Sequence, residues 1–225
     1  MGMVIVTGGS SGLGAAVADA IAAGGGTPVV LDRVPPPSGA AFAEVDLART
    51  RDAEAAVRRV AEEHGRIDGV VTAAGVDTPA PFGALDGEAW ERIVAVNLLG
   101  TAAIIRGALP ALEAAHGRVV TVASTLGFRV FPDATAYCAS KFGVVGLSRA
   151  LAVELAGRVG VTMLVPGGMR THFFDDRDDT YKPGPDAQLN DPADVARAVV
   201  FALRQPPGCE VRELVVTPAT EPSWP

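Results

Sequence analysis

The sequence predicts an α/β fold, a doubly wound parallel sheet of about seven strands with helices on both faces. Short apolar runs rich in valine and isoleucine alternate with longer stretches in which apolar residues recur at helical spacing. The first pattern is typical of buried parallel strands, and the second of the helices that cover them. With 225 residues, of which 48% are hydrophobic, the chain is long enough for one core, so we expect a single domain over residues 1–225.

The order of these elements follows from the positions of the runs. Apolar runs predict strands at Met3–Thr7, Pro28–Leu31, Gly69–Thr72, Arg118–Ala123, Val161–Val165 and Glu213–Thr217, with a weaker signal at Ala41–Val45. Helical spacing predicts helices at Leu13–Ala23, Arg51–His64, Gly87–Ala115, Ala134–Gly157 and Pro192–Gln205. Alternation of this kind places ligands at the carboxyl ends of the strands.

Charge and composition argue against several classes of function. A net charge of -7 leaves no basic face for nucleic acid or for an anionic membrane. The two cysteines, Cys138 and Cys209, cannot form a disulfide framework, so we expect a reducing, cytoplasmic compartment. The apolar stretch Val96–Leu112 is interrupted by polar residues and proline, falls short of the roughly 20 residues that span a bilayer, and predicts a packed helix. Neither His64 nor His116 has metal-ligand spacing to other side chains, so we expect no metal site.

A glycine-rich turn joins the first strand to the first helix. Strand Met3–Thr7 runs into Gly8-Gly9-Ser10-Ser11-Gly12-Leu13-Gly14, after which helical spacing begins. Glycines at these positions let the backbone turn sharply and approach a diphosphate, while the amide groups of the helix start attract the anion. The alternative is a turn with a purely structural role. The spacing favours dinucleotide binding.

Two carboxylates follow the next strands. Asp32 ends the second strand, where an acidic side chain would meet the adenosine ribose. A 2'-phosphate about 4 Å away would be repelled by roughly 4 kcal/mol, so NAD is favoured over NADP. Arg33 weakens this preference for NAD, because its side chain could pair with the 2'-phosphate of NADP if it turned towards the ribose. Asp46 either reaches the adenine edge or caps the helix that starts near Arg51.

A tyrosine and a lysine stand one helical turn apart. Tyr137 and Lys141 lie in a stretch of helical spacing, which puts both side chains on one face. Free tyrosine has a pKa near 10, and a nearby ammonium group favours the phenolate, so the pair suits acid–base chemistry. The alternative is an exposed pair that only stabilises the helix. Because the chain has only two tyrosines, we favour the catalytic interpretation.

Two further polar residues are candidates. Ser124 follows strand Arg118–Ala123 at the carboxyl edge, where its hydroxyl either holds a substrate oxygen or closes a strand-end turn. Asn97 lies among apolar residues in a predicted helix, although asparagine is a poor helix former. We therefore expect a local partner for its amide group.

Taken together, the motifs resemble the short-chain dehydrogenase/reductase family. They are Thr7-Gly8-x-x-x-Gly12-x-Gly14, Asn97, Ser124, Tyr137-x-x-x-Lys141 and Pro166-Gly167-x-x-x-Thr171, and the resemblance runs from about Met3 to Thr217. It implies a Rossmann-like sheet and hydride transfer between NAD(H) and a small secondary alcohol or ketone. It also implies a homotetramer or homodimer built on the two long helices.

The resemblance also implies roles for individual residues. Tyr137 would be the general acid/base, Lys141 would bind the nicotinamide ribose and lower the tyrosine pKa, and Ser124 would orient the carbonyl. Asn97 would support a water in a proton relay, and Thr171 would lie near the nicotinamide carboxamide. The expected cofactor-binding residues are Gly8, Ser10, Ser11, Gly12, Leu13, Gly14, Asp32, Asp46, Leu47, Ala74, Gly75, Tyr137, Lys141, Pro166, Gly167, Met169 and Thr171.

The chain departs from the family pattern in places. The family's Asn-Asn-Ala-Gly is Thr72-Ala73-Ala74-Gly75 here, which keeps backbone contacts but removes two amide side chains. Residues 172–190 are expected to form a substrate lid. Within it Phe173 and Phe174, with Phe128 and Phe131, either line an apolar pocket or pack on the sheet, and four aspartates between 175 and 179 form a solvated flank. Two alternatives remain: a dinucleotide-binding regulator without turnover, and an NAD-using epimerase or lyase.

Overall fold

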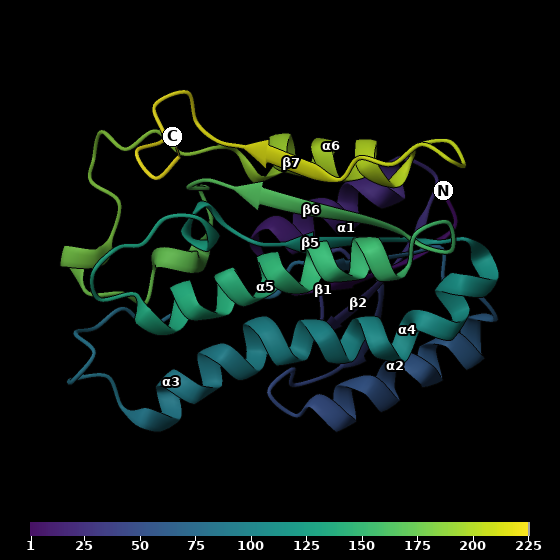
Figure 1. Ribbon diagram of the computed structural model, residues 1–225, viewed down its shortest axis with the longest axis horizontal. Helices are drawn as coiled ribbons and strands as arrows, with labels where there is room; N and C mark the ends of the chain where they lie inside the picture. The colour runs from purple at the N-terminus through teal and green to yellow at the C-terminus, as the bar shows by residue number, and fades with distance from the viewer. Residues whose placement is uncertain (225) are drawn as a thin grey trace.

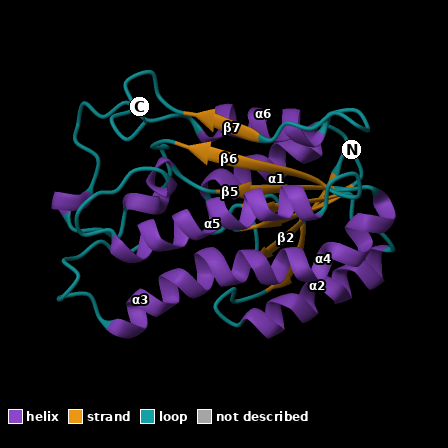
Figure 2. Ribbon diagram, in the orientation of Figure 1, coloured by secondary structure: helices purple, strands orange, loops and turns teal. Residues whose placement is uncertain are grey.

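Seven strands form where the apolar runs lie, in a computed structural model that describes residues 1–224 (Figures 1 and 2). Their order across the sheet is β3-β2-β1-β4-β5-β6-β7, and every neighbouring pair is parallel. The strands are β1 (Met3–Thr7), β2 (Thr27–Asp32), β3 (Ala41–Glu44), β4 (Gly69–Thr72), β5 (Arg118–Val122), β6 (Gly160–Pro166) and β7 (Glu213–Val216). The predicted α/β fold class is confirmed, including the weakly signalled strand β3.

The strand order reverses beside β1. From β1 the chain builds outward to β2 and β3, then returns to place β4 on the other side of β1. Thr7 lies level with Leu31 of β2 and Thr72 of β4, so these strands end together at one edge. In Figure 1 the arrowheads of β6 and β7 point to the side where the C-terminus lies. Such a reversal point is where ligands bind in open α/β sheets.

Helices cover both faces of the sheet (Figure 2). On one face α1 (Gly12–Ala23) packs against α6 (Pro192–Leu203), and their apolar side chains share a core with Val4 and Val6. The other face carries α2 (Thr50–His64), α4 (Thr101–Ala115) and α5 (Thr135–Glu154). Burial of Ile104 and Leu112 of α4 against Val57 of α2 closes this second core.

The helix predicted over Gly87–Ala115 is continuous but not uniform. It begins as α3 (Gly87–Val94), passes through a π-helical turn over Ala95–Gly100, and continues as α4. The segment is 29 residues long and apolar enough to cross a membrane by length and composition, but 56% of its most apolar window is buried within the protein. It is longer than the interrupted stretch suggested, and its packing against α2 and the sheet accounts for its apolar character.

The segment expected to form a lid has only short turns. Two 3-10 turns, His172–Phe174 and Asp179–Tyr181, interrupt an otherwise irregular path from β6 to α6. The segment is tied to the sheet edge at its far end, where Met169 forms an isolated bridge with Asn190. It therefore lies beside the carboxyl ends of the strands.

Candidate active site

The glycine turn is packed so closely that side chains are excluded from it. Gly8 and Gly12 have φ angles of 68° and 51°, a region that favours glycine. A Cβ added to Gly14 would lie 2.1 Å from the carbonyl oxygen of Gly8, and one added to Gly8 would lie 2.7 Å from Cα of Ala74. The amide of Ala74 donates to the Thr7 hydroxyl over 3.2 Å, which ties the two loops together. The result is a tightly packed turn without side chains at Gly8 and Gly14, at the start of α1.

The other residues of this turn divide between core and surface. Ser11 occupies the N-cap position of α1 but its side chain makes no capping hydrogen bond. Ser10 donates its hydroxyl to the carbonyl of Val34, and its amide donates to Asp32. Leu13 is buried in the core between α1 and α6, so only its backbone can face a ligand.

Asp32 lies against the glycine turn, as its position in the sequence predicts. One carboxylate oxygen accepts the Ser10 amide over 3.1 Å, and the other accepts the Arg33 amide over 2.7 Å. These two bonds fix an anion at the end of β2 beside the turn. The side chain of Arg33 is exposed.

Asp46 does not cap a helix, so that alternative is wrong. Helix α2 begins at Thr50, and its N-cap residue Arg49 offers no side-chain cap. Asp46 instead accepts the Ala48 amide over 3.0 Å and pairs with Arg92 at 3.3 Å. Burial acts to raise the pKa of Asp46, but these two partners hold it below its usual value. The neighbouring Leu47 is buried, so its side chain belongs to the core.

Tyr137, Lys141 and Ser124 meet at the carboxyl edge of β5. The ammonium nitrogen of Lys141 lies 5.5 Å from the centre of the Tyr137 ring and donates to the Val122 carbonyl over 2.9 Å. Ser124 follows β5, and its hydroxyl forms a hydrogen bond with the Tyr137 phenol that acts to lower the tyrosine pKa. The same hydroxyl accepts a hydrogen bond from the Leu126 amide over 3.1 Å. Ser124 therefore closes the turn at the end of β5 and faces the Tyr137 phenol at the same time, so the two alternatives for this residue do not exclude each other.

Burial dominates the protonation of this group. It raises the pKa of Tyr137 above its ordinary value, although the Ser124 hydroxyl acts in the opposite direction. The lowered tyrosine pKa expected from Lys141 is thus wrong, because burial outweighs the groups that lower it. Burial also lowers the pKa of Lys141 to about 8, against the opposing effect of the Asp77 carboxylate. The phenol is held protonated, and the lysine is close to its titration range at neutral pH.

The lysine shift predicts a pH-dependent stability. Between pH 8, where folded Lys141 titrates, and pH 10.5, where an ordinary lysine does, the unfolded chain binds a proton that the folded chain has lost. Stability relative to a Lys141→Met variant should therefore rise with pH across this window, by about 3 kcal/mol. The Tyr137 phenol, whose pKa burial raises above its ordinary value of 10, keeps its proton over most of this window in both proteins. Chemical denaturation from pH 7 to 10.5 measures it, and a constant difference would contradict the burial argument.

The amide of Asn97 is satisfied locally, as expected. Its Nδ2 donates to the Val76 carbonyl over 2.9 Å and to Ser140 Oγ over 3.0 Å, while Oδ1 accepts the Val76 amide over 2.8 Å. The Thr101 hydroxyl donates to the backbone carbonyl of Asn97 over 2.8 Å, within the π-helical turn. Asn97 thus connects the loop after β4 to the helix that carries Tyr137. Whether it also supports a water stays a prediction.

Loops after β4 and β6 complete the edge. A Cβ on Gly75 would lie 3.7 Å from the Lys141 ammonium nitrogen, so this backbone is open towards the lysine. After Pro166, which ends β6, the Gly167 amide donates to the Val216 carbonyl over 3.0 Å. A Cβ on Gly12 would meet the Thr171 side chain at 3.3 Å, so the loop returns to the glycine turn. The structure therefore brings the predicted site segments together at one sheet edge.

The lid places one phenylalanine on the tyrosine and adds an ion pair that the sequence analysis missed. The Phe173 ring lies 5.8 Å from that of Tyr137, whereas Phe128 packs on Trp224 and Phe131 is exposed. Arg177 pairs with Asp77 over 2.9 Å, with both side chains largely buried. In the sequence Arg177 stands out only as a lone cation among four aspartates, which does not identify Asp77 as its partner.

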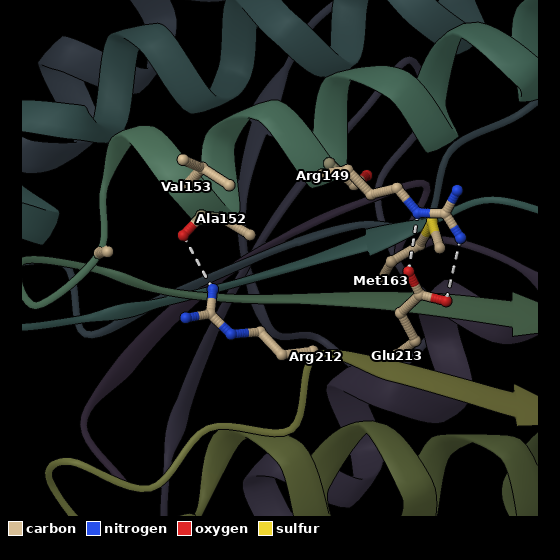
Figure 3. Close-up of a pocket in the computed structure, with 8 residues that line it drawn as sticks. Arg149, Ala152, Val153, Met163, Arg212 and Glu213 are labelled. Atoms are coloured by element: carbon tan, nitrogen blue, oxygen red, sulfur yellow. Dashed lines mark hydrogen bonds and ion pairs between the residues drawn. The ribbon is translucent and has the colours of Figure 1, made fainter.

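A separate hollow of about 490 Å³ lies away from these residues, between α5 and the β6–β7 edge. Figure 3 shows Arg149 facing Glu213, at 2.8 Å, and Arg212 donating to the Ala152 carbonyl, also at 2.8 Å. Arg212 also pairs with Glu210. The charged groups that line this hollow are already paired, and none of the predicted site residues contributes to it.

Comparison with known proteins relates this geometry to a family. A family profile described as short chain dehydrogenase matches residues 2–182. The chain is 35% identical to a D-threitol dehydrogenase of Mycolicibacterium smegmatis, over 88% of this chain and 84% of that protein. It is 33% identical to the glycine betaine reductase ATRR of Emericella nidulans over 98% of its own length, but spans only 19% of that much longer protein.

Solved structures agree with the fold and show both forms of the cofactor. A 3-ketoacyl-(acyl-carrier-protein) reductase from Brucella melitensis complexed with NADH has a TM-score of 0.85 at 27% identity, over 97% of this chain and 98% of that one. A metagenomic short-chain oxidoreductase in complex with NADP has a TM-score of 0.81 at 27% identity, over 96% of each chain.

Proposed function

The chain belongs to the short-chain dehydrogenase family of oxidoreductases, and from that premise we propose that it transfers a hydride between NAD(H) and a secondary alcohol or ketone. The observation that carries the proposal is the meeting of Tyr137, Lys141 and Ser124 beside the glycine turn. A relative named D-threitol dehydrogenase supports a hydroxylated substrate. We further propose a cytoplasmic homodimer or homotetramer.

The residues at the edge fit a nicotinamide dinucleotide. Side chains are excluded at Gly8 and Gly14, so the turn packs closely on the start of α1, and a diphosphate at that helix start would meet backbone instead of side chains. Asp32 would hold the adenosine ribose, with Asp46 and the Leu47 backbone on the adenine side. Lys141, beside the bare backbone of Ala74 and Gly75, would bind the nicotinamide ribose, and the segment from Pro166 through Met169 to Thr171 would border the ring. When bound, the cofactor supplies or accepts the hydride.

The protein's own part in the reaction is to hold the substrate oxygen and move one proton. In reduction, the Ser124 hydroxyl donates a hydrogen bond to the carbonyl oxygen while Tyr137 gives that oxygen its proton. The Tyr137 phenol carries this proton at neutral pH, and the Ser124 hydroxyl acts to lower its pKa against the effect of burial. In oxidation the deprotonated Tyr137 oxygen takes the proton of the alcohol, and the Lys141 ammonium stabilises this phenolate before the transfer.

A panel of alcohols and ketones assayed with NAD and NADP in parallel tests the proposal. A lasting absorbance change at 340 nm is expected with secondary alcohols or ketones. No change with any compound, despite cofactor binding, would favour a regulator without turnover. Substrate conversion without net change in the cofactor would favour an epimerase or lyase.

Asp32 should determine which cofactor is preferred. Replacing it with alanine removes the anion that would repel a 2'-phosphate, so the ratio of kcat/KM for NADP to that for NAD should rise by about 10² to 10³. Asp19→Ala, which removes an exposed carboxylate of α1, is the matched control and should leave the ratio unchanged. Parallel kinetics with the two cofactors measure it, and a wild-type preference for NADP would overturn the role of Asp32.

A further inference from the structure

The ion pair of Asp77 and Arg177 joins the lid to the loop after β4, beside the proposed proton donor. The two residues are 100 positions apart, and their side chains are only 5% and 12% exposed. Arg177 belongs to the lid and lies near Tyr137, since its guanidinium carbon is 4.7 Å from the centre of the Phe173 ring, which contacts Tyr137. Both charges are close enough to act on the Tyr137 phenol.

Arg177 has a donor that the folded protein leaves without a partner. One terminal nitrogen donates to Asp77 over 2.9 Å, and the guanidinium plane contacts Phe173 and Phe174. Its Nε is buried, and within residues 1–224 it meets no hydrogen-bond acceptor. A buried, unpaired donor of a charged group is costly, and this cost would be offset if a bound ligand brought an acceptor to the guanidinium.

The charges of Arg177 and Asp77 determine which kind of ligand group can bind between them. A substrate carboxylate would be attracted by Arg177 but repelled by Asp77, and an ammonium group would meet the reverse. A hydroxyl group suits both, because it accepts from the guanidinium and donates to the carboxylate. The Phe173 ring next to them offers an apolar surface to the carbon skeleton of the same molecule.

We infer that Asp77 and Arg177 form a hydroxyl-recognition subsite, which selects polyhydroxylated alcohols or ketones over compounds with one oxygenated carbon. The inference rests on the proposed function, because it assumes that the reacting hydroxyl of the substrate lies at Tyr137. A second hydroxyl of the same molecule would then lie beside it, at Asp77 and Arg177. Arg177 and Asp77 are specificity residues in this arrangement and take no part in proton transfer. A site built to bind a hydroxyl strongly rejects the analogue that lacks it.

The test compares alditols of four and six carbons with butan-2-ol and hexan-2-ol respectively, which share the carbon skeletons but lack the extra hydroxyls. For the wild type, kcat/KM for the best alditol should exceed that of its matched alcohol by about 100-fold or more. Arg177→Met should reduce this ratio to within about 10-fold, mainly by lowering the alditol value. Arg177→Lys keeps a positive charge opposite Asp77 but loses Nε, and should also lose the preference.

Controls separate recognition from a structural role of the lid. Arg197→Met removes a cation from an exposed pair with Asp194 on α6 and should leave the ratio unchanged. If Arg177→Met does not fold because Asp77 is left unpaired, the Asp77→Asn/Arg177→Met double variant takes its place. A ratio that stays high in the variants, or an equal loss with both kinds of substrate, would overturn the inference.

A binding measurement distinguishes failure of the subsite from failure of the proposed function. Calorimetry of alditol and matched alcohol binding to the Tyr137→Phe protein with NAD present reports recognition without turnover. Loss of alditol binding in the Tyr137→Phe/Arg177→Met protein would support the subsite even if the wild type oxidised no alcohol. Equal binding of alditol and alcohol to the Tyr137→Phe protein would overturn it even if the proposed function held.

Discussion

Tyr137→Phe should reduce kcat by about 10³-fold or more while cofactor affinity changes little, because it removes only the oxygen that carries the proton. The ring remains to pack against Phe173, and Lys141 keeps its hydrogen bond to the Val122 carbonyl. The glycine turn and Asp32 are untouched. Steady-state kinetics at 340 nm and calorimetric titration with NAD measure the two effects separately.

The chain's other tyrosine provides the control for this experiment. The Tyr181 hydroxyl donates to Asp133 over 3.0 Å in the lid region, so Tyr181→Phe makes the same chemical change outside the proposed proton path. It should retain kcat within a few-fold of the wild type. If Tyr137→Phe kept most of the wild-type kcat, the tyrosine would not be the general acid/base, and the proposed mechanism would be wrong.

The sheet and most of the helices could be predicted because their signals are local. A central strand such as β1 is buried at every position, so its whole run is apolar. The edge strand β3 is half exposed, which explains its weaker signal. The π-helical turn at Asn97 could not be foreseen, because it shows the same apolar spacing as the α-helix around it. Local spacing also brought Tyr137 and Lys141 to one helix face.

Features that depend on distant contacts could not be predicted in this way. Asp77 and Arg177 meet only because the lid folds back onto the loop after β4, and neither residue has a partner at helical or strand spacing. The direction of the Tyr137 pKa shift depends on how much of the ring is buried, which the sequence does not reveal. Asp46 lies near the start of α2, but the N-cap position is Arg49, three residues later, so its carboxylate cannot cap the helix.

Gly14→Ala should abolish cofactor binding, because the added methyl group has no space to occupy. Its Cβ would lie 2.1 Å from the Gly8 carbonyl oxygen and 2.9 Å from the Gly9 amide nitrogen. Both are backbone atoms, so the start of α1 must move away from the glycine turn. We expect the Kd for NAD to rise by at least about 100-fold, with a loss of about 1–3 kcal/mol in stability from overpacking.

Gly146→Ala is the matched substitution for Gly14→Ala, since a Cβ at that exposed position of α5 meets nothing within 4 Å. It should leave NAD binding unchanged and stabilise the helix by about 0.5–1 kcal/mol. Calorimetric titration and thermal denaturation of both variants measure the contrast. Normal NAD affinity in Gly14→Ala would mean that the bare backbone of the turn does not hold the diphosphate, and the dinucleotide would have to bind elsewhere on the sheet edge.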